Sequence, residues 1–230
     1  MRSRPIKMPS FFATLKCNYT SFFLPLASAA LLLAVPVAAH AQFGVPPGGT
    51  QVHDPAALHP PAGARVAIVE FEDMECPDCA VANPVLKEAA AKYHIPWIRH
   101  DFPLPFHNWS FQAAVYARWF DTKSKAIGDG YRDYIFASQR SIDTPVALTA
   151  YTETYAHSKG LELPFSIDPQ GKLAAEVKAD YALGQRIGID HTPTIWVTTD
   201  HSKGAPFVEV VDRSRLYQII DQALADTRGR

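Results

Sequence analysis

The sequence is poor in cysteine, in net charge and in repetition. Its 230 residues hold only three cysteines, Cys17, Cys76 and Cys79, too few for a fold held together by several disulfides. The 22 basic and 23 acidic side chains nearly cancel, and no internal repeat or block of five like charges occurs. A hydrophobic content of 47% with 20% charged residues excludes the disordered and fibrous classes. We therefore expect a globular protein of one large or two small domains.

Residues 1–41 have the layout of an export signal. Basic residues and no acidic ones precede an apolar run from Phe22 to Ala39, and Ala39-His40-Ala41 places small residues at the two positions that a signal peptidase reads. We predict cleavage after Ala41 and a mature protein that is periplasmic or secreted. The alternative is an uncleaved anchor, because about 18 apolar residues are just long enough to span a bilayer. Two prolines within the run favour cleavage.

The predicted mature chain is acidic. Residues 1–41 hold four of the basic side chains and none of the acidic ones, so the remainder has a net charge of −5, which argues against nucleic acid as a partner. Contact with a membrane is expected only through the signal segment, if that segment is not cleaved. Residues 42–64 are rich in proline and glycine, which indicates a linker or N-terminal leader.

Residues 65–228 have the pattern of an α/β domain. Apolar runs predict strands over 65–71, 95–102, 194–199 and 207–211, the last two paired as a hairpin. Helical spacing of apolar residues predicts helices over 77–93, 109–125, 131–139, 145–159, 171–186 and 212–227. Gly128-Asp129-Gly130 is expected to close the second of these helices. The aromatic residues expected in the core are Trp97, Trp109, Phe111 and Trp119.

Cys76-Pro77-Asp78-Cys79 lies at the junction of the first predicted strand and helix. In the first turn of a helix, a thiol meets unsatisfied backbone N–H groups and the positive end of the helix dipole, and both stabilise its thiolate. The second thiol, one turn away, is placed to attack a mixed disulfide formed by the first. Pro77 suits the first helical position, because its missing N–H costs nothing there. The pattern predicts thiol–disulfide exchange in which Cys76 reacts and Cys79 resolves.

Two other interpretations of the cysteine pair are open at this point. The same spacing forms half of a zinc site, although the sequence has no second cysteine pair and its histidines are scattered. A purely structural disulfide between Cys76 and Cys79 would close too short a loop to restrain the unfolded chain much. We therefore expect no metal among the site residues and no cofactor.

The segment from Val69 to Cys79 resembles the active-site segment of the DsbA-like thiol–disulfide oxidoreductases of the thioredoxin superfamily. Asp101-Phe102-Pro103-Leu104 followed by His107, the helical block, and Gly188 to Thr194 match the same family in the same order, roughly over residues 65–228. The resemblance implies a thioredoxin-like fold, with a central mixed sheet flanked by helices and a helical subdomain inserted at about 105–187. It also implies cysteine-containing exported proteins as substrates, a membrane or soluble redox partner, and no cofactor.

The resemblance assigns roles outside the cysteine motif as well. It makes Pro193 a cis-proline and Thr192 the residue whose backbone pairs with an extended substrate chain, whereas an ordinary trans proline is the alternative. It makes Glu70, six residues before Cys76, a buried proton acceptor for Cys79 with a pKa raised by burial. The alternative for Glu70 is an edge position that faces solvent.

The chain departs from the family pattern around the cysteines. Asp78 stands where strongly oxidising relatives have histidine, and Glu72, Asp73 and Glu75 add negative charge that we expect to oppose a Cys76 thiolate. A less stable thiolate makes the disulfide more stable, so the direction of exchange, as oxidase, reductase or isomerase, stays open.

His191, directly before Thr192, stands where small residues are common in the family. It could offset the acidic residues, join the cysteines as a metal ligand, or simply be exposed. With Cys76 and Cys79 it supplies the main rival hypothesis, a copper-handling thioredoxin-fold protein, because thiolates and an imidazole suit Cu(I). A redox-inactive binding module is a third hypothesis.

Overall fold

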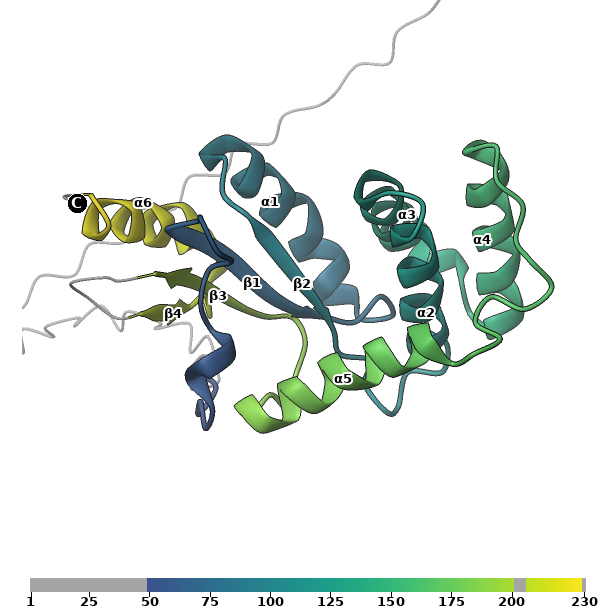
Figure 1. Cartoon of the computed structure of the whole chain (residues 1–230), viewed down its shortest axis with the longest axis horizontal. Helices are drawn as coiled ribbons and strands as arrows, with labels where there is room; N and C mark the ends of the chain where they lie inside the picture. The colour runs from purple at the N-terminus through teal and green to yellow at the C-terminus, as the bar shows by residue number, and fades with distance from the viewer. Residues whose placement is uncertain (1–48, 201–205, 229–230) are drawn as a thin grey trace, which may run out of the picture. The chain divides into compact units, whose positions relative to one another are not determined.

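The centre of the fold is a mixed sheet. The computed structural model describes residues 49–200 and 206–228, and its strands are β1 (Val66–Glu72), β2 (Trp97–Asp101), β3 (Thr194–Thr199) and β4 (Phe207–Glu209). They lie side by side in the order β2-β1-β3-β4 (Figure 1). β1 runs parallel to β2 and antiparallel to β3, and β3 runs antiparallel to β4. The predicted pairing of the last two strands is thus confirmed.

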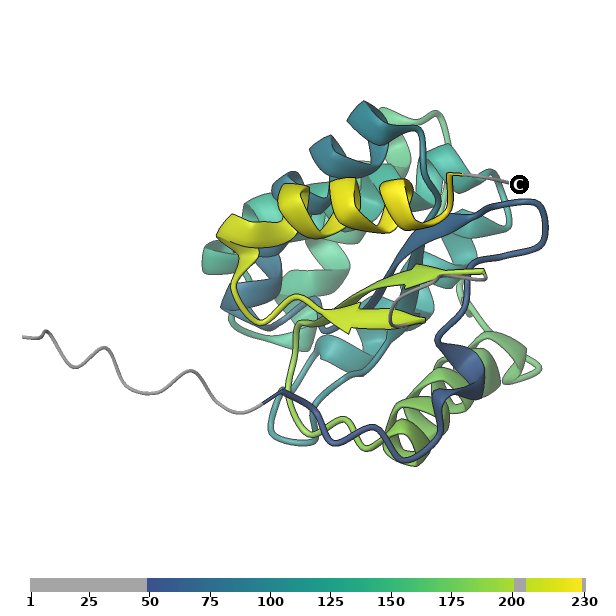
Figure 2. The same ribbon diagram turned by 90° about the vertical axis from the view of Figure 1, so that its left-hand side faces the viewer.

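Helices cover both faces of this sheet. They are α1 (Pro77–Tyr93), α5 (Lys172–Ile187) and α6 (Leu216–Asp226), the last preceded by a 3-10 turn, η3 (Arg213–Arg215). Figure 2 shows α1 and α6 on one side of the strands and α5 on the other. Ile68 packs in the cluster that holds Ile220 of α6, whereas Phe71 packs in the cluster that holds Ile187 of α5. The pleat of β1 therefore sends its side chains alternately into two cores.

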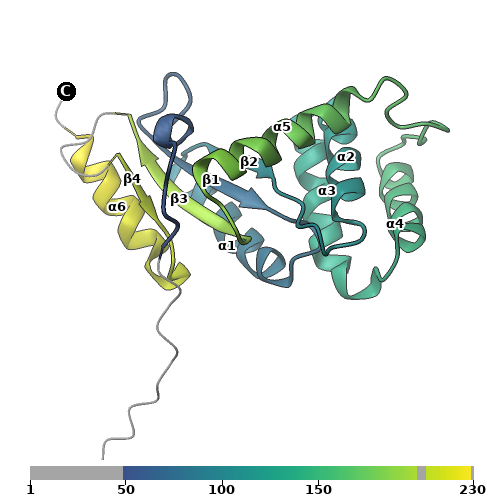
Figure 3. The same cartoon turned by 90° about the horizontal axis from the view of Figure 1, so that it is seen from below.

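The segment between β2 and α5 forms a helical unit beyond one end of the sheet (Figure 3). It consists of α2 (Ser110–Asp121), α3 (Lys125–Ser138), the 3-10 turn η2 (Gln139–Ser141) and α4 (Pro145–Ser158). Its core includes the buried side chains of Phe120, Tyr131 and Leu148, and the same cluster contains Cys76 and Cys79. The cysteine pair therefore lies where the helical unit meets the sheet.

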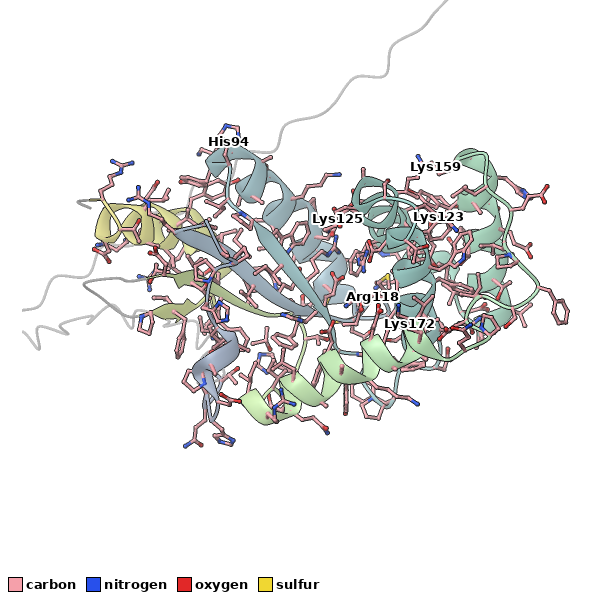
Figure 4. All side chains as sticks on the ribbon, viewed as in Figure 1. His94, Arg118, Lys123, Lys125, Lys159 and Lys172 are labelled. Carbon is pink, nitrogen blue, oxygen red and sulfur yellow. The ribbon has the colours of Figure 1, made fainter. Side chains whose placement is uncertain are left out.

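Arg118 of α2 ties the helical unit to the sheet (Figure 4). Its Nε donates to Oδ2 of Asp101 in β2 at 2.6 Å, and its Nη2 pairs with Asp180 of α5. Asp180 also accepts from the backbone N–H of Asp101 at 3.1 Å and contacts Nδ1 of His100 at 2.9 Å. Three elements distant in sequence are held together by this group of charges.

Gly128-Asp129-Gly130 does not end a helix, so this part of the prediction is wrong. α2 ends earlier, at Asp121, and α3 runs through both glycines. The side chain of Ser124 accepts from the backbone N–H of Ile127 at 3.1 Å and so caps α3. A Cβ atom at Gly128 would lie 1.8 Å from Oδ1 of Asp121. The glycine therefore serves a close approach of α2 and α3, not a turn.

Phe111 is another exception, because its side chain is 38% exposed and not in the core. The buried side of α2 follows Ala113, Ala117 and Phe120, a stripe of mostly small residues that a pattern of large apolar side chains does not reveal. Trp109 and Trp119 are buried as predicted, and Trp97 is half-buried.

The described part of the N-terminal segment packs on the domain. The backbone N–H of His53 donates to the carbonyl of Ile187 at 2.8 Å, a 3-10 turn η1 covers Pro55–Ala57, and the side chain of Leu58 is 3% exposed. The proposed boundaries at 41, 64 and 228 stay predictions, and residues 1–41 lie outside the described residues. Within the ranges that the structure describes, no helix has the length and apolarity to cross a membrane.

Candidate active site

Cys76 is the N-cap residue of α1, and Pro77 occupies the first helical position as predicted. The carbonyl of Cys76 accepts from the backbone N–H of Ala80 at 3.2 Å, which starts the helix. The Sγ atom of Cys76 lies 3.2 Å from the carbonyl oxygen of Thr192, to which it donates in its thiol form. The reactive thiol is thus placed between the head of α1 and the loop that precedes β3.

Cys79 lies one turn further along α1 and is fully buried. Its Sγ accepts from the backbone N–H of Asp73 at 3.4 Å. Within the described part of the chain, neither Cys76 nor Cys79 is in a disulfide. The structure therefore corresponds to the reduced, dithiol form of the pair.

The pKa values of the two thiols are shifted in opposite directions. The pKa of Cys76 is lowered from 9.0 to about 6, first by the hydrogen bond from the Cys79 thiol, with further help from the Thr192 side chain and the backbone N–H groups of residues 78 and 79, and against the effect of burial. Burial raises the pKa of Cys79 well above its usual value, and the neighbouring Cys76 raises it further. At neutral pH, Cys76 is mainly a thiolate and Cys79 a thiol.

The loop before β3 adjoins the cysteines as the sequence predicts. The peptide bond between Thr192 and Pro193 is cis, so the alternative of a trans proline is wrong. Thr192 is 8% exposed, and its hydroxyl has no hydrogen-bond partner among residues 49–200 and 206–228. This hydroxyl is close enough to Cys76 to favour its thiolate form.

Glu70 is buried, so its alternative placement at a solvent-facing edge is wrong. It lies in β1, between β2 and β3, and is 1% exposed. Burial, and then the nearby carboxylate of Glu72, raise the pKa of Glu70 to about 8. The charge of Glu70 in turn raises the pKa of Cys79. A mostly protonated carboxyl group therefore lies within electrostatic reach of the buried thiol.

Glu72 does not crowd the thiolate with charge. Its carboxylate binds Nε and Nη2 of Arg99 at 3.0 and 2.5 Å, and its Oε1 lies 3.3 Å from Nε of Arg132. All three side chains are nearly inaccessible to solvent. The negative charge of Glu72 is therefore compensated by two arginines.

Asp73 and Glu75 are also committed to other partners. Oδ2 of Asp73 accepts from the backbone N–H of Leu104 at 2.7 Å and contacts Nδ1 of His107 at 2.8 Å. Oε2 of Glu75 accepts from the backbone N–H groups of the N-cap residue and the first residue of α2, at 2.7 and 3.0 Å. Both carboxylates thus organise the turn and the segments beside it, and the net effect of the surroundings of Cys76 is to lower its pKa, not to weaken the thiolate as expected.

Asp78 and His191 flank the site on its exposed side. Asp78 lies 3.4 Å from Nη2 of Arg213, and Nδ1 of His191 lies 2.7 Å from Oδ1 of Asp190. Both line a cleft of about 740 Å³ that extends from Thr192. The interpretation of His191 as an exposed residue is the one that fits, since its side chain is 46% exposed.

The copper hypothesis is not favoured by this geometry. Within the described ranges, no group of three or more histidine, cysteine, aspartate or glutamate side chains is arranged to hold a metal ion. His191 is turned to Asp190 and does not join Cys76 and Cys79 in such a group.

Gln139 is a site residue that the sequence analysis missed. Its Nε2 donates to the carbonyl oxygens of Met74 and Cys76, both at 2.9 Å, and so fixes the turn that carries the cysteines. Trp97 was expected only as a core residue, yet its Nε1 donates to Oε2 of Glu70 at 3.0 Å. Arg99, which binds Glu72, is a further site residue that the sequence does not indicate. No local pattern could have indicated these contacts, because 27 to 65 residues separate the partners.

A dithiol at the head of the first helix, facing a cis-proline loop on a mixed sheet, defines a protein of the thioredoxin class. Residues 61–213 match the family model Thioredoxin_4, described as Thioredoxin, and the chain belongs to this family. The predicted thioredoxin-like fold with a helical insertion is thereby confirmed. No curated protein sequence matches the chain at a significant level.

Several solved structures share the fold. The thiol-disulfide exchange protein α-DsbA2 from Wolbachia pipientis superposes with a TM-score of 0.56 at 18% identity, covering 71% of this chain and 84% of that one. DsbA2 from Pseudomonas aeruginosa gives 0.53 at 20%, covering 74% and 95%, and a periplasmic thioredoxin-like protein from Salmonella enterica serovar Typhimurium gives 0.57 at 18%, covering 71% and 87%. The DsbA-like resemblance of the sequence thus extends to the three-dimensional fold.

Proposed function

We propose that this protein is an exported thiol–disulfide oxidoreductase that exchanges disulfides with cysteines of other exported proteins. The observation that carries the proposal is the Cys76 thiol at the head of α1, with a pKa of about 6, backed by the buried Cys79 thiol one turn away. The solved Wolbachia protein of the same fold is itself described as a thiol-disulfide exchange protein. The export and the location in the periplasm or outside the cell rest on the predicted signal at residues 1–41.

The proposed chemistry is a two-step exchange. A substrate thiolate attacks Sγ of Cys76 in the oxidised pair, the S–S bond breaks, and Cys79 leaves with the electron pair and takes a proton from Glu70. A second substrate thiolate then attacks the substrate sulfur of the mixed disulfide, and Cys76 leaves as a thiolate. The substrate is oxidised by two electrons and the cysteine pair is reduced, while Glu70 regains its proton from solvent. The reverse sequence reduces a substrate disulfide.

The oxidising direction is the one that the electrostatics support. A low pKa of Cys76 stabilises the reduced pair, which makes the disulfide form a stronger oxidant. A membrane or soluble redox partner must then restore the disulfide, and no cofactor is needed. The proposal therefore differs from an isomerase or a reductase, for which a partner must keep the pair reduced.

The remaining site residues have supporting roles in this proposal. The backbone of Thr192, beside Pro193, would pair with the extended substrate chain next to its cysteine. Pro77, Asp78 and His191 would tune the acidity of Cys76, through the helix start and through charge on the exposed side of the site.

Oxidation of a dithiol peptide by the purified mature domain tests the proposal. The wild-type protein, oxidised and then mixed with the peptide, is expected to transfer its disulfide, and Cys76→Ser is expected to be inactive. Cys79→Ser, which cannot form the internal disulfide, is mixed instead with the disulfide form of the peptide. Its Cys76 thiolate is expected to attack that disulfide and to accumulate as a mixed disulfide, detectable by mass spectrometry, because the resolving thiol is missing. Equal, background rates for the wild type and Cys76→Ser would refute the proposed function.

A further inference from the structure

The two carboxyl oxygens of Glu70 have different surroundings. Oε2 accepts the indole N–H of Trp97 at 3.0 Å. Oε1 is buried and has no hydrogen-bond partner among the described residues. A carboxyl group that accepts at one oxygen carries its acid proton on the other. In the protonated form of Glu70, the O–H is therefore on Oε1 and the carbonyl oxygen faces Trp97.

Trp97 is itself held in place. The register of β1 and β2 pairs Glu70 with Arg99, so Trp97 and Arg99, two residues apart on β2, share the face of the sheet to which Glu70 points. The guanidinium carbon of Arg99 lies 4.2 Å from the centre of the Trp97 ring. Arg99 is fixed in turn by Glu72, through two of its nitrogens. The indole ring is thus held in place by the backbone of β2, to which it belongs, and by its contact with the buried guanidinium group of Arg99.

We propose that Trp97 is a positioning residue, which fixes Glu70 so that Oε1, which makes no direct hydrogen bond, exchanges its proton with Cys79 through an intervening water molecule. The inference rests on the proposed function. When Cys79 leaves the disulfide as a thiolate, the water molecule gives a proton to Sγ and takes one from Oε1, so that the O–H bond at Oε1 breaks as the S–H bond forms. The carboxylate that results keeps the hydrogen bond from Trp97 at Oε2. In the reverse step, Oε1 takes the proton from the Cys79 thiol.

The hydrogen bond from Trp97 also keeps this proton exchangeable. Burial favours the neutral form of Glu70, and the bond from Trp97 is stronger to a carboxylate than to a neutral acid, so it partly opposes that effect. The other charged or titratable groups that act on Glu70 are Glu72, Arg99 and Cys76. Without the indole N–H, Glu70 would hold its proton to higher pH and could turn either oxygen to Cys79.

Trp97→Phe is the direct test, because it removes the N–H and keeps an aromatic ring on β2. Trp109→Phe is the matched control, since Trp109 is buried and its Nε1 donates to the carbonyl of Ile142 in the helical unit. The measurement is the rate at which Cys79 displaces glutathione from a mixed disulfide at Cys76, followed by stopped flow from pH 5 to 10. For Trp97→Phe we expect this rate at pH 7 to fall about tenfold and its upper pH midpoint to rise by about one unit.

The alkylation midpoint of Cys76 should be the same in the wild type, Trp97→Phe and Trp109→Phe, because the proposed effect is confined to the resolving step. In a Glu70→Gln background, Trp97→Phe should have no further effect, since the group through which Trp97 acts is gone. An equally large effect in that background would mean that Trp97 only supports the fold, and the inference would be overturned.

A second replacement covers the case in which Trp97→Phe does not fold. Benzothienylalanine at position 97 keeps the shape of the indole and replaces its N–H with sulfur, and it should reproduce the tenfold loss. A wild-type rate with this residue would overturn the inference while the proposed function stands. If wild-type protein fails to exchange disulfides at all, the proposed function fails. The ¹³C chemical shift of the Glu70 carboxyl group, titrated in the wild type and the variant, then reports on the Trp97 bond without any turnover.

Discussion

Arg99 and Glu72 form an ion pair inside the protein, with 2.5 Å between Nη2 and Oε2 and 3% and 1% of the two side chains exposed. Arg132 of α3 approaches the same carboxylate and continues to Asp121 at the end of α2, with 2.8 Å between Nη2 and Oδ2. These charges connect the first two strands to the helical unit, four residues before Cys76. The reactive turn is therefore built on a buried ionic network.

Arg99→Met should destabilise the protein strongly, because it leaves Glu72 buried with one arginine fewer. We expect the free energy of unfolding in urea at pH 7 to fall by about 3 kcal/mol, the lower end of what breaking a buried pair costs, since Arg132 still faces Glu72. Lys125→Met, which breaks the exposed pair with Asp129, is the control and should have no measurable effect. Equal stability of the two variants would contradict the assigned importance of the network.

The local elements were predictable because their signals are local. Pro77 at the first position and the helical spacing of Val81, Val85 and Leu86 mark α1, and the predicted range 77–93 agrees with the structure. The same holds for β3, whose branched apolar run is bounded by Pro193. The α2–α3 boundary was missed, because the glycines in α3 serve contacts between helices and not a turn.

The candidate site was predictable only in part. The cysteine pair, Glu70 and the loop at Thr192 were found from sequence, because the family resemblance marks them. The partners of the acidic side chains could not be predicted, since a carboxylate near a cysteine in sequence can bind a partner far along the chain. Glu75 illustrates this, because it binds the start of α2 more than 30 residues away and not the thiol turn.

The reactivity of Cys76 should depend on pH with a midpoint near 6. Its pKa is depressed, so the thiolate, which alone is alkylated, persists down to about pH 6 and is lost below it. Thr192→Val removes a side chain that favours the thiolate and should move the midpoint upward. The measurement is the rate at which iodoacetamide alkylates Cys76, as a function of pH, in proteins that retain Cys79.

Thr198→Val is the control for that substitution, because Thr198 is also buried, lies in β3, and its hydroxyl donates to the backbone of Ala67. It should leave the midpoint unchanged. A midpoint of 8 or above in the wild type would contradict the low pKa of Cys76 and weaken the case for an oxidising protein.

Gly128→Ala should destabilise the packing of α2 on α3. The new Cβ would lie 1.8 Å from Oδ1 of Asp121 and 3.0 Å from its backbone nitrogen, and a helix backbone cannot move away cheaply. We expect a loss of about 1–3 kcal/mol in urea unfolding, despite the better helix propensity of alanine. Gly130→Ala is the comparison, since its Cβ would meet only the hydroxyl end of Tyr155, and it should lose less. The reverse order of the two variants would contradict the close helix contact.

The buried carboxyl of Glu70 should make the protein less stable as the pH rises. Its pKa in the folded state is about 8, above the ordinary 4.5. Below pH 4.5 the carboxyl group is protonated in both the folded and the unfolded chain, so its ionisation does not affect stability. Between pH 4.5 and 8 the unfolded chain gains stability by ionising while the folded protein does not, so the free energy of unfolding falls as the pH rises. Glu70→Gln, which cannot ionise, should therefore gain about 3 kcal/mol on the wild type between pH 4 and pH 7 in urea unfolding. Glu153→Gln on the exposed side of α4 controls for the loss of a surface charge. A difference between Glu70→Gln and the wild type that stays constant over this range would show that Glu70 ionises normally, and its role as proton donor to Cys79 would be lost with it.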